Sequence, residues 1–340
     1  MSMKQASFFD MEVARSHALL DKAGDPLAKL DRFINWQSLD PVLKPLRFDN
    51  SEKGGRPAWD ALLMVKILVL QALYNIADGS CEYQINDRAS FKRFLGLNPG
   101  DKAPDEKTIW LWRERIKHGG LHDRIFSWFD NELNRAGYSA QKGQIVDATF
   151  VPTHKPTGKQ DKQLKEGIPL TPAQAAQRDE DATFTRKGDK TFHGYKNHIQ
   201  TDVKNKFIRA HTTTTASTHD SQELDNLIDP TGNTGRDVYA DSAYRSAKTE
   251  GKLRGDKLNS KVHYRAYRGK PLTETQKKTN TARSRVRARV EHIFGHMVTS
   301  MNGLMIHTIG LARATVKVTF KNLAYNLQRF AYFEGRAAAA

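Results

Sequence analysis

The segment Ile145-Val146-Asp147-Ala148-Thr149-Phe150-Val151 decides how this chain folds. Its residues alternate between two faces and are rich in β-branched side chains, which predicts a β-strand. Val146, Ala148 and Phe150 would point to one face, while Asp147 and Thr149 point to the other. A carboxylate in a core strand destabilises the fold unless it is paired or bound to a metal. Asp147 is therefore the first candidate for a functional residue.

The chain before this strand has helical patterns. A turn is expected at residues 54–57, and Asp60 can cap a helix that runs to about residue 77. That helix is apolar on most sides, which is typical of the centre of a bundle. Further helices are expected at residues 80–95, 104–118 and 121–136. Residues 1–137 are therefore predicted to form an all-helical domain.

The chain after residue 137 mixes strand and helix patterns, which favours an α/β domain at residues 138–335. Strands are expected at residues 145–151, 195–203, 207–216, 237–240 and 262–267, and helices at 219–228, 281–301 and 312–332. Residues 155–190 are polar, interrupted by Pro and Gly and without strong periodicity. We interpret them as a flexible insertion that either becomes ordered on DNA or is an idle loop.

The charge balance favours a polyanionic partner. Fifty-four Lys and Arg residues against 38 Asp and Glu residues give a formal net charge of +16. Residues 244–289 contain 15 basic and three acidic residues, a local net charge of +12. A solvated surface is the alternative, but so strong a local bias is more typical of a surface that binds nucleic acid.

Several other classes of protein are disfavoured. The most apolar stretch, residues 61–73, is too short to span a membrane and contains Lys66, and no signal peptide is visible. The single cysteine, Cys81, suits a reducing compartment, so we expect a cytoplasmic, nucleoid-associated protein. Neither a Walker loop nor a dinucleotide fingerprint is present, and ATP hydrolysis is not expected.

Two more carboxylates lie in unusual positions. Asp241 directly follows the short strand pattern Val238-Tyr239-Ala240. Glu291 lies in an Arg-rich run of the helix at 281–301 and follows Val290, a member of its buried stripe. Each acid alone would more often pair with an arginine or cap an element. Together with Asp147, they are three hard oxygen ligands of the kind that hold a pair of Mg²⁺ ions for phosphodiester chemistry.

These segments resemble the three acidic motifs of bacterial insertion-sequence transposases, and the best match is the DDE group named after insertion sequence five. The matching motifs are Ile145-Val146-Asp147-Ala148-Thr149, Ala240-Asp241-Ser242-Ala243-Tyr244-Arg245 and Arg287-Ala288-Arg289-Val290-Glu291. Residues 87–97 and Gly194-Tyr195-Lys196-Asn197-His198 are also similar, so the resemblance covers nearly the whole chain.

The resemblance implies a ribonuclease-H-like catalytic core, a mixed sheet flanked by helices, preceded by the helical DNA-binding domain. It implies that Asp147, Asp241 and Glu291 are the catalytic residues and the ligands of two Mg²⁺ ions, for which Mn²⁺ would substitute. Asp147 would lie on the first strand, Asp241 after the fourth and Glu291 on a following helix. The activity implied is cleavage at terminal inverted repeats and joining of 3′-hydroxyl ends to target DNA, by a homodimer that holds both ends.

The chain departs from a related pattern, Tyr-x2-Arg-x3-Glu-x6-Lys. Arg287 and Glu291 match it, but Ser284 and Val298 stand at the Tyr and Lys positions. Arg287 lies one helical turn before Glu291 and so faces the same side. It would hold a DNA phosphate beside the metal, or pair with the acid. A mechanism that depends on the missing Tyr and Lys, such as base flipping to form a hairpin, is not supported.

Six basic residues are candidates for contacting DNA. Four lie near the predicted carboxylate site and two on the expected helix at 104–118, where Trp110 and Trp112 are either core residues or part of a recognition surface. They are Lys196, His198, Arg245, Arg287, Arg113 and Arg115.

Three alternatives stay open. His292 and His296 are four residues apart and would face one zinc ion, although their order does not match the usual zinc-protease motif. A catalytically silent DNA-binding regulator would have the same basic composition. A ribonuclease-H-like nuclease without strand transfer would have the same three acids.

Overall fold

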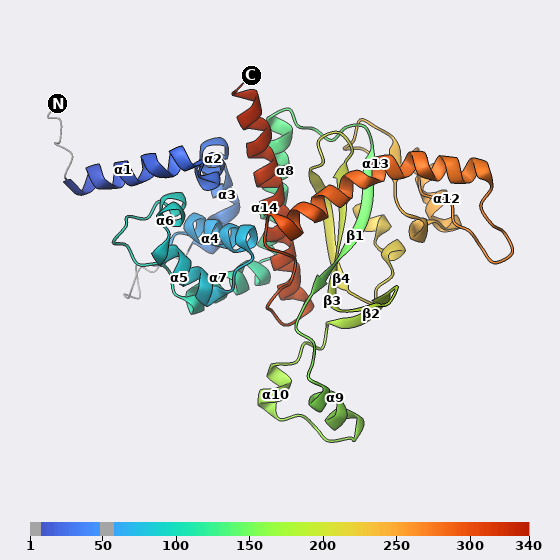
Figure 1. The fold of residues 1–340 in the computed structure, drawn as a ribbon, viewed down its shortest axis with the longest axis horizontal. Coiled ribbons are helices and arrows are strands. Elements are labelled where there is room, and N and C mark those ends of the chain that lie inside the picture. Colours follow the sequence, from blue (N-terminus) through green and yellow to red (C-terminus); the bar gives the residue numbers. More distant parts are fainter. Residues whose placement is uncertain (1–7, 48–57, 340) are drawn as a thin grey trace. The chain divides into compact units, whose positions relative to one another are not determined.

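The computed structural model describes residues 8–47 and 58–339, and the turn expected at residues 54–57 lies outside them (Figure 1). The chain divides into two compact units: Met1–Trp128 with Leu323–Ala340, and Phe129–Asn322. The boundary expected at residue 137 stays a prediction about function, with DNA-end binding and dimerisation assigned before it and catalysis after it. Among the described residues no single helix is long and apolar enough to cross a membrane, and the one helix pair that passes by length and composition is bent by 102°.

The first unit is helical, as expected. Asp60 accepts a hydrogen bond from the Leu63 N–H at 2.9 Å and so caps the central helix, whose residues are buried on most sides. The helix expected at residues 80–95 is broken at Arg88, which has extended backbone; its N–H closes one helix and its carbonyl begins the next. The helices are α1 (Phe8–Ala23), α2 (Pro26–Phe33), α3 (Asp40–Leu43), α4 (Ala61–Tyr74), α5 (Asp78–Asp87), α6 (Ala89–Leu95), α7 (Glu106–His118) and the start of α8 (Leu121–Arg135).

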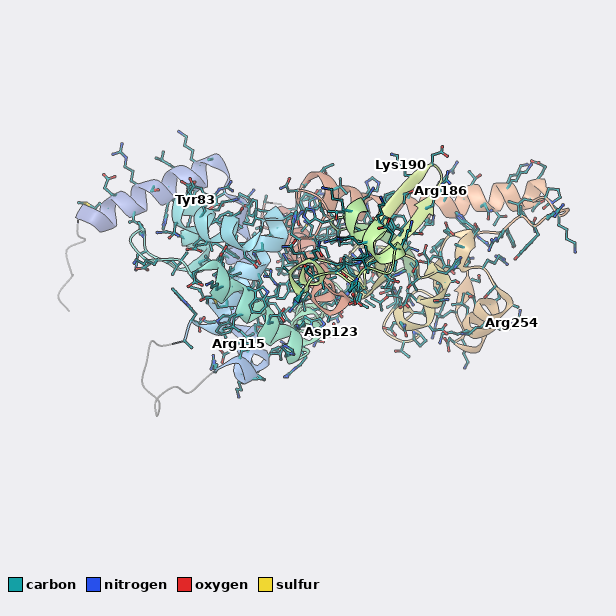
Figure 2. All side chains as sticks on the ribbon, turned by 90° about the horizontal axis from the view of Figure 1, so that it is seen from below. Tyr83, Arg115, Asp123, Arg186, Lys190 and Arg254 are labelled. Carbon is teal, nitrogen blue, oxygen red and sulfur yellow. The ribbon has the colours of Figure 1, made fainter. Side chains whose placement is uncertain are left out.

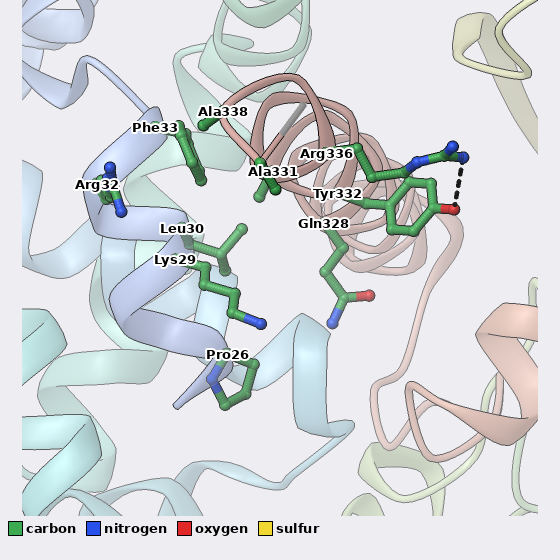
Figure 3. Close-up of a pocket in the computed structure, with 12 residues that line it drawn as sticks. Pro26, Lys29, Leu30, Arg32, Phe33, Gln328, Ala331, Tyr332, Arg336 and Ala338 are labelled. Atoms are coloured by element: carbon green, nitrogen blue, oxygen red, sulfur yellow. Dashed lines mark hydrogen bonds between the residues drawn. The ribbon is translucent and has the colours of Figure 1, made fainter. Parts of the chain in front are cut away.

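A cavity of about 570 Å³ in this unit lies between α2 and the end of α14 (Leu311–Ala337) (Figure 3). Leu30, Phe33 and Ala331 contribute apolar lining, and the Arg336 guanidinium donates a hydrogen bond to the Tyr332 hydroxyl at 3.3 Å. None of the residues predicted to be catalytic or to bind DNA lines this cavity.

The second unit is built on a six-stranded mixed sheet. β1 lies in the middle, antiparallel to β3 and parallel to β5; β4 pairs antiparallel with β3 on one side, and β6 pairs parallel with β5 on the other. The strands are β1 (Gln144–Pro152), β2 (Thr183–Lys187), β3 (Lys190–Asp202), β4 (Ile208–Thr215), β5 (Asp237–Tyr239) and β6 (Asn259–Ser260). This arrangement confirms the expected ribonuclease-H-like core.

Helices pack against both faces of the sheet, and each face forms a hydrophobic core with them. Val146 of β1 packs in a cluster with residues of β5, α11 (Leu224–Leu227) and α12 (Ala247–Gly255). Val151 packs in a second cluster with Tyr195 and residues of α14. Because Val146 and Val151 lie on opposite faces of β1, Asp147 shares the face of Val151. The long α13 (Glu274–Thr299) crosses β1 and β5, and a capping box at Thr273 starts it earlier than the sequence indicated.

The strand expected at residues 262–267 is wrong. Val262 is fully buried, but its carbonyl accepts hydrogen bonds from the guanidinium groups of Arg245 (2.8 Å) and Arg283 (2.6 Å) rather than from a neighbouring strand. Both guanidinium groups also lie over the Tyr264 ring. The His263 N–H donates to the Ala240 carbonyl at 3.1 Å, just after β5, so the segment starts against the sheet and then continues as a loop held by the two arginines; β6 is the short pair of residues before it.

The insertion at residues 155–190 contains more regular structure than its sequence indicated. It forms α9 (Gly158–Lys165), α10 (Pro172–Ala176) and β2. Its two ends are joined to the core at a neck: the Thr153 N–H donates to the His193 carbonyl, and the His154 and His307 rings are in contact through nitrogens 2.8 Å apart. On the return side, Asp181 accepts from the Leu311 N–H at the start of α14 (2.7 Å).

Candidate active site

The two aspartates of the predicted triad belong to neighbouring parallel strands, Asp147 within β1 and Asp241 two residues after the end of β5. β1 and β5 pair with Gln144 opposite Val238 and Ile145 opposite Tyr239. The same offset of 94 residues places Asp147 opposite Asp241, immediately beyond the end of β5. Each carboxylate is fixed by a local backbone hydrogen bond, Asp147 from the Ala148 N–H and Asp241 from the Ala243 N–H. The strand pairing therefore brings together two acids that are far apart in sequence.

Glu291 reaches the same region from α13. Val290, Ile293 and Met297 are fully buried and fix the helix against the sheet, which confirms most of the stripe expected from the sequence. The Glu291 side chain is 63% exposed and points away from that core. Unlike the two aspartates, it is held by one long contact, 3.4 Å from Arg287.

Arg287 joins the aspartate to the glutamate. Its Nη1 donates to Asp147 Oδ2 at 2.6 Å, and its Nη2 lies 3.4 Å from Glu291 Oε1. Both partners of the shorter pair are largely buried, with side chains 22% and 18% exposed. Two roles were expected for Arg287, contact with a DNA phosphate or pairing with the acid, and the structure contains the pairing.

The electrostatics of the site centre on Asp147. Burial raises the pKa of its carboxyl above the usual value, and the negative charge of Asp241 adds to this rise, while the Arg287 guanidinium opposes it. Lys187, on the hairpin formed by β2 and β3, also acts to lower the pKa of Asp147. Any further cation near the site would also offset the free-energy cost of burying the charged Asp147 carboxylate.

The chemistry of these three residues fits a hard divalent cation, since carboxylate oxygens are the ligands that Mg²⁺ prefers. Within residues 8–47 and 58–339, however, no three His, Cys, Asp or Glu side chains are arranged to hold a metal ion. The guanidinium of Arg287 lies between Asp147 and Glu291 and keeps them apart. His292 and His296 likewise have no third ligand beside them among the described residues, which argues against a zinc site there.

Three of the predicted DNA contacts are buried. Lys196 is bound to the Thr218 carbonyl and to Asp220 at 2.8 Å, and His198 is fully buried beside Thr214. Arg113 is 4% exposed and paired with Asp78. These side chains stabilise their own domains, and the geometry argues against their contacting DNA. Burial also lowers the pKa of His198 to about 4, so that its imidazole is neutral at pH 7.

Two other candidates have different surroundings. Arg245 is bound to the Val262 carbonyl and lies near Glu250, so it holds the loop after β6. Arg115 lies at the surface of the helical unit (Figure 2), with its guanidinium over the ring of Trp112, which is buried. Trp110 is 45% exposed. Trp112 is therefore a core residue, while Arg115 and Trp110 stay candidates for contact with DNA.

A ribonuclease-H-like sheet with carboxylates on two adjacent strands and a facing helix defines a class of proteins that process nucleic acid. Residues 138–327 match the model described as "Transposase DDE domain", and residues 15–115 match "Transposase domain (DUF772)". The chain therefore belongs to the family of transposases with a DDE domain, which acts on DNA and depends on a divalent metal.

A search of solved structures finds the "Cryo-EM structure of piggyBac transposase synaptic complex with hairpin DNA (SNHP)", which is 11% identical in sequence. The match covers 93% of this chain and 76% of that chain, with a TM-score of 0.49.

Proposed function

We propose that this protein is a transposase of the insertion-sequence-five group that cleaves the terminal inverted repeats of its element and joins their 3′-hydroxyl ends to target DNA. The observation that carries the proposal is the meeting of Asp147 and Asp241 across β1 and β5, with Glu291 linked to Asp147 through Arg287. Two ends must be held together during the reaction, so we propose that the protein acts as a homodimer on DNA.

The three acids would have different roles. Asp147 and Asp241 are held by the backbone and would form a preorganised pair of ligands, while the exposed Glu291 would complete the site after Arg287 releases Asp147. Mg²⁺ or Mn²⁺ bound there would supply a stronger nucleophile and would stabilise the leaving oxygen. The freed Arg287 guanidinium would then bind a DNA phosphate, with which it forms a two-pronged contact as readily as with a carboxylate.

Cleavage of DNA tests the catalytic assignment. A duplex made from the sequence that flanks the coding region would be incubated with wild-type protein and Mg²⁺, and with Asp147→Asn and Glu291→Gln. Glu274→Gln, on the exposed first turn of the same helix, is the matched control. The proposal expects cleavage by the wild type and the control only. DNA binding without cleavage by any of the four proteins would identify a silent regulator instead.

Adding target DNA separates a transposase from a nuclease. Strand transfer predicts a product in which the cleaved 3′ end is covalently joined to the target, and the joint depends on Glu291. Cleavage with no joined product at any target concentration would support the nuclease alternative. The mass of the protein–DNA complex, measured by light scattering, tests whether two copies hold the two ends.

A further inference from the structure

The two aspartates lie side by side across β1 and β5, and the segment after β6 adds a third residue to this row. The Asn259 N–H donates to the carbonyl just before Asp237, which is the residue that Asn259 pairs with in β5. The His263 N–H donates in the same way to the carbonyl just before Asp241, at 3.1 Å. Because parallel strands keep this evenly spaced hydrogen-bond pattern, His263 lies opposite Asp241.

The buried side of the sheet gives independent support for this register. Val146, Ala240 and Val262 each precede one of the three residues in the row, and all three pack in one hydrophobic cluster. Successive side chains of a strand point to opposite faces of the sheet, so the two aspartates and His263 point together to the other face. Adjacent strands are about 4.8 Å apart, which places His263 one strand spacing from Asp241.

One turn of α13 contacts both ends of this row (Figure 1). The Arg287 guanidinium donates to Asp147 at 2.6 Å. Three residues earlier on the same helix, the Ser284 hydroxyl lies 3.4 Å from Nε2 of His263. Ser284 stands at the Tyr position of the pattern from which this chain departs, so a short hydroxyl takes the place of a phenol beside the His263 ring. His263 therefore lies between the sheet and α13, on the far side of Asp241 from Asp147.

The His263 ring is partly buried and has one nitrogen left for a ligand. Within residues 8–47 and 58–339, the Ser284 hydroxyl is the hydrogen-bond partner of Nε2, and Nδ1 has none. Burial and the charge of Arg287 lower the pKa of His263, while Asp241 raises it, and the imidazole is neutral at pH 7. A neutral imidazole carries a single N–H. When Ser284 donates its hydroxyl hydrogen to Nε2, that N–H is on Nδ1 and is available to an acceptor.

We propose that His263 donates a hydrogen bond from Nδ1 to a non-bridging oxygen of the phosphate that enters the carboxylate site, and that Ser284 orients its ring. Mg²⁺ prefers oxygen ligands, so an imidazole beside its site is better suited to bind the substrate than the metal. A phosphate oxygen only accepts hydrogen bonds and therefore selects the tautomer with the hydrogen on Nδ1. The inference rests on the proposed function, because it names a contact with that function's substrate.

Ethylation interference tests the contact without requiring cleavage. An ethyl group removes the charge of a phosphate and blocks an oxygen, so ethylation of a contacted phosphate weakens binding. The probe is the flanking-sequence duplex, sparsely ethylated and bound in Ca²⁺ by wild type, His263→Ala and Asn259→Ala. Asn259 is the matched control, since it lies on the same face of the same segment and donates to Asp237 instead. We expect interference at the cleaved phosphate or its immediate neighbour for wild type and control, and none there for His263→Ala.

Cleavage rates at saturating DNA test which ring nitrogen donates. His263→Ala should slow cleavage about 10- to 100-fold, because a hydrogen bond to a charged group is lost. His263→Asn should stay within about fivefold of wild type, since its amide N–H lies near the position of Nδ1. His263→Gln, whose amide reaches toward the position of Nε2, should be as slow as His263→Ala. Asn259→Ala should change the rate less than about twofold.

The outcomes separate the two proposals. If the wild type cleaves and His263→Ala keeps the wild-type interference pattern, or loses it only far from the cleaved phosphate, the His263 contact is overturned and the transposase function stands. A Gln variant as active as the Asn variant would also overturn the contact through Nδ1. If the wild type binds but does not cleave, the catalytic proposal fails. The His263 contact then stands if His263→Ala loses interference at one phosphate that the Asn259→Ala control keeps, and falls if the two patterns are the same.

Discussion

Replacing Arg287 with Ala is expected to tighten Mg²⁺ binding about 10- to 30-fold in the absence of DNA. The guanidinium occupies the space between Asp147 and Glu291, so a metal ion must displace it before both acids become available. Removing Arg287 removes this competition. The same change should lower the rate of DNA cleavage, so the affinity for Mg²⁺ and the catalytic activity are expected to change in opposite directions.

The magnitude follows from the two contacts. The 2.6 Å bond to Asp147 joins two side chains that are 22% and 18% exposed. A hydrogen bond between charged groups contributes about 1.5–3 kcal/mol, and partial exposure favours the lower end. The 3.4 Å contact with Glu291, 63% exposed, adds at most a few tenths of a kcal/mol. A total of about 1.5–2 kcal/mol corresponds to a factor of about 10–30 in affinity.

Thermal unfolding at a series of Mg²⁺ concentrations measures this affinity, since a ligand that binds only the native state raises the Tm according to its Kd. The control is Arg285→Ala, which removes the same charge from the same helix at an exposed position. Any tightening caused by net charge alone would be shared by both variants. The reasoning is refuted if Arg287→Ala binds Mg²⁺ no more tightly than Arg285→Ala does.

Three further predictions concern residues that the structure places in the core. Arg113→Ala should destabilise the protein by about 3 kcal/mol in urea unfolding, because it leaves Asp78 without its buried partner, while the DNA affinity of the folded fraction stays unchanged. Gly194→Ala should lower the free energy of unfolding by about 2–4 kcal/mol, because the new Cβ would clash with the backbone and the residue would be strained. Gly188→Ala, whose Cβ would meet nothing within 4 Å, should lower it by about 1 kcal/mol. Equal losses in the two variants would contradict the bend assigned to Gly194, where φ is +141°. The pKa of His198 is lowered from 6.5 to about 4, so its neutral imidazole contributes to the stability of the fold above pH 6.5. That contribution to stability is lost as the pH falls toward 4. Urea midpoints from pH 7.5 to 4.5 should therefore fall more steeply in the wild type than in His198→Gln.

Local patterns in the sequence were sufficient for most of the fold. The alternation at residues 145–151, the cap at Asp60 and the buried stripe of α13 all correspond to elements in the structure. The acidic motifs predicted Asp147, Asp241 and Glu291 as the site, a prediction that stays open, and the pairing of β1 with β5 explains why the first two meet. These features depend on periodicity and on short motifs, which a single sequence contains.

The features that the sequence did not predict depend on contacts between distant segments. Lys196 was a candidate for DNA because of its charge, but Asp220, 24 residues away, binds it inside the fold. Residues 262–267 have strand-like composition, yet Arg245 and Arg283 bind the carbonyl that a strand partner would need. A basic side chain in a sequence has no visible partner, so charge alone overestimates the number of residues that reach DNA.

The hairpin of β2 and β3 was missed for a related reason. It lies in an insertion whose polar composition masked a short alternating pattern, residues 183–187 and 190–193, on either side of the turn at Gly188. That pattern is the local signal of a hairpin. The bend at Gly194 sets the direction in which this hairpin leaves the sheet, and no periodicity in the sequence reports that direction.

The neck of the insertion has a consequence for how this protein can change. Thr153 is bonded to His193 where the chain leaves the sheet, and Asp181 is bonded to Leu311 where it comes back. With departure and return points tied to the same part of the core, the intervening stretch around α9 and α10 can lengthen, shrink or be exchanged without altering strand register. Evolution can therefore vary this lobe among related elements, and protein engineers can graft a new module there, while the carboxylates keep their positions.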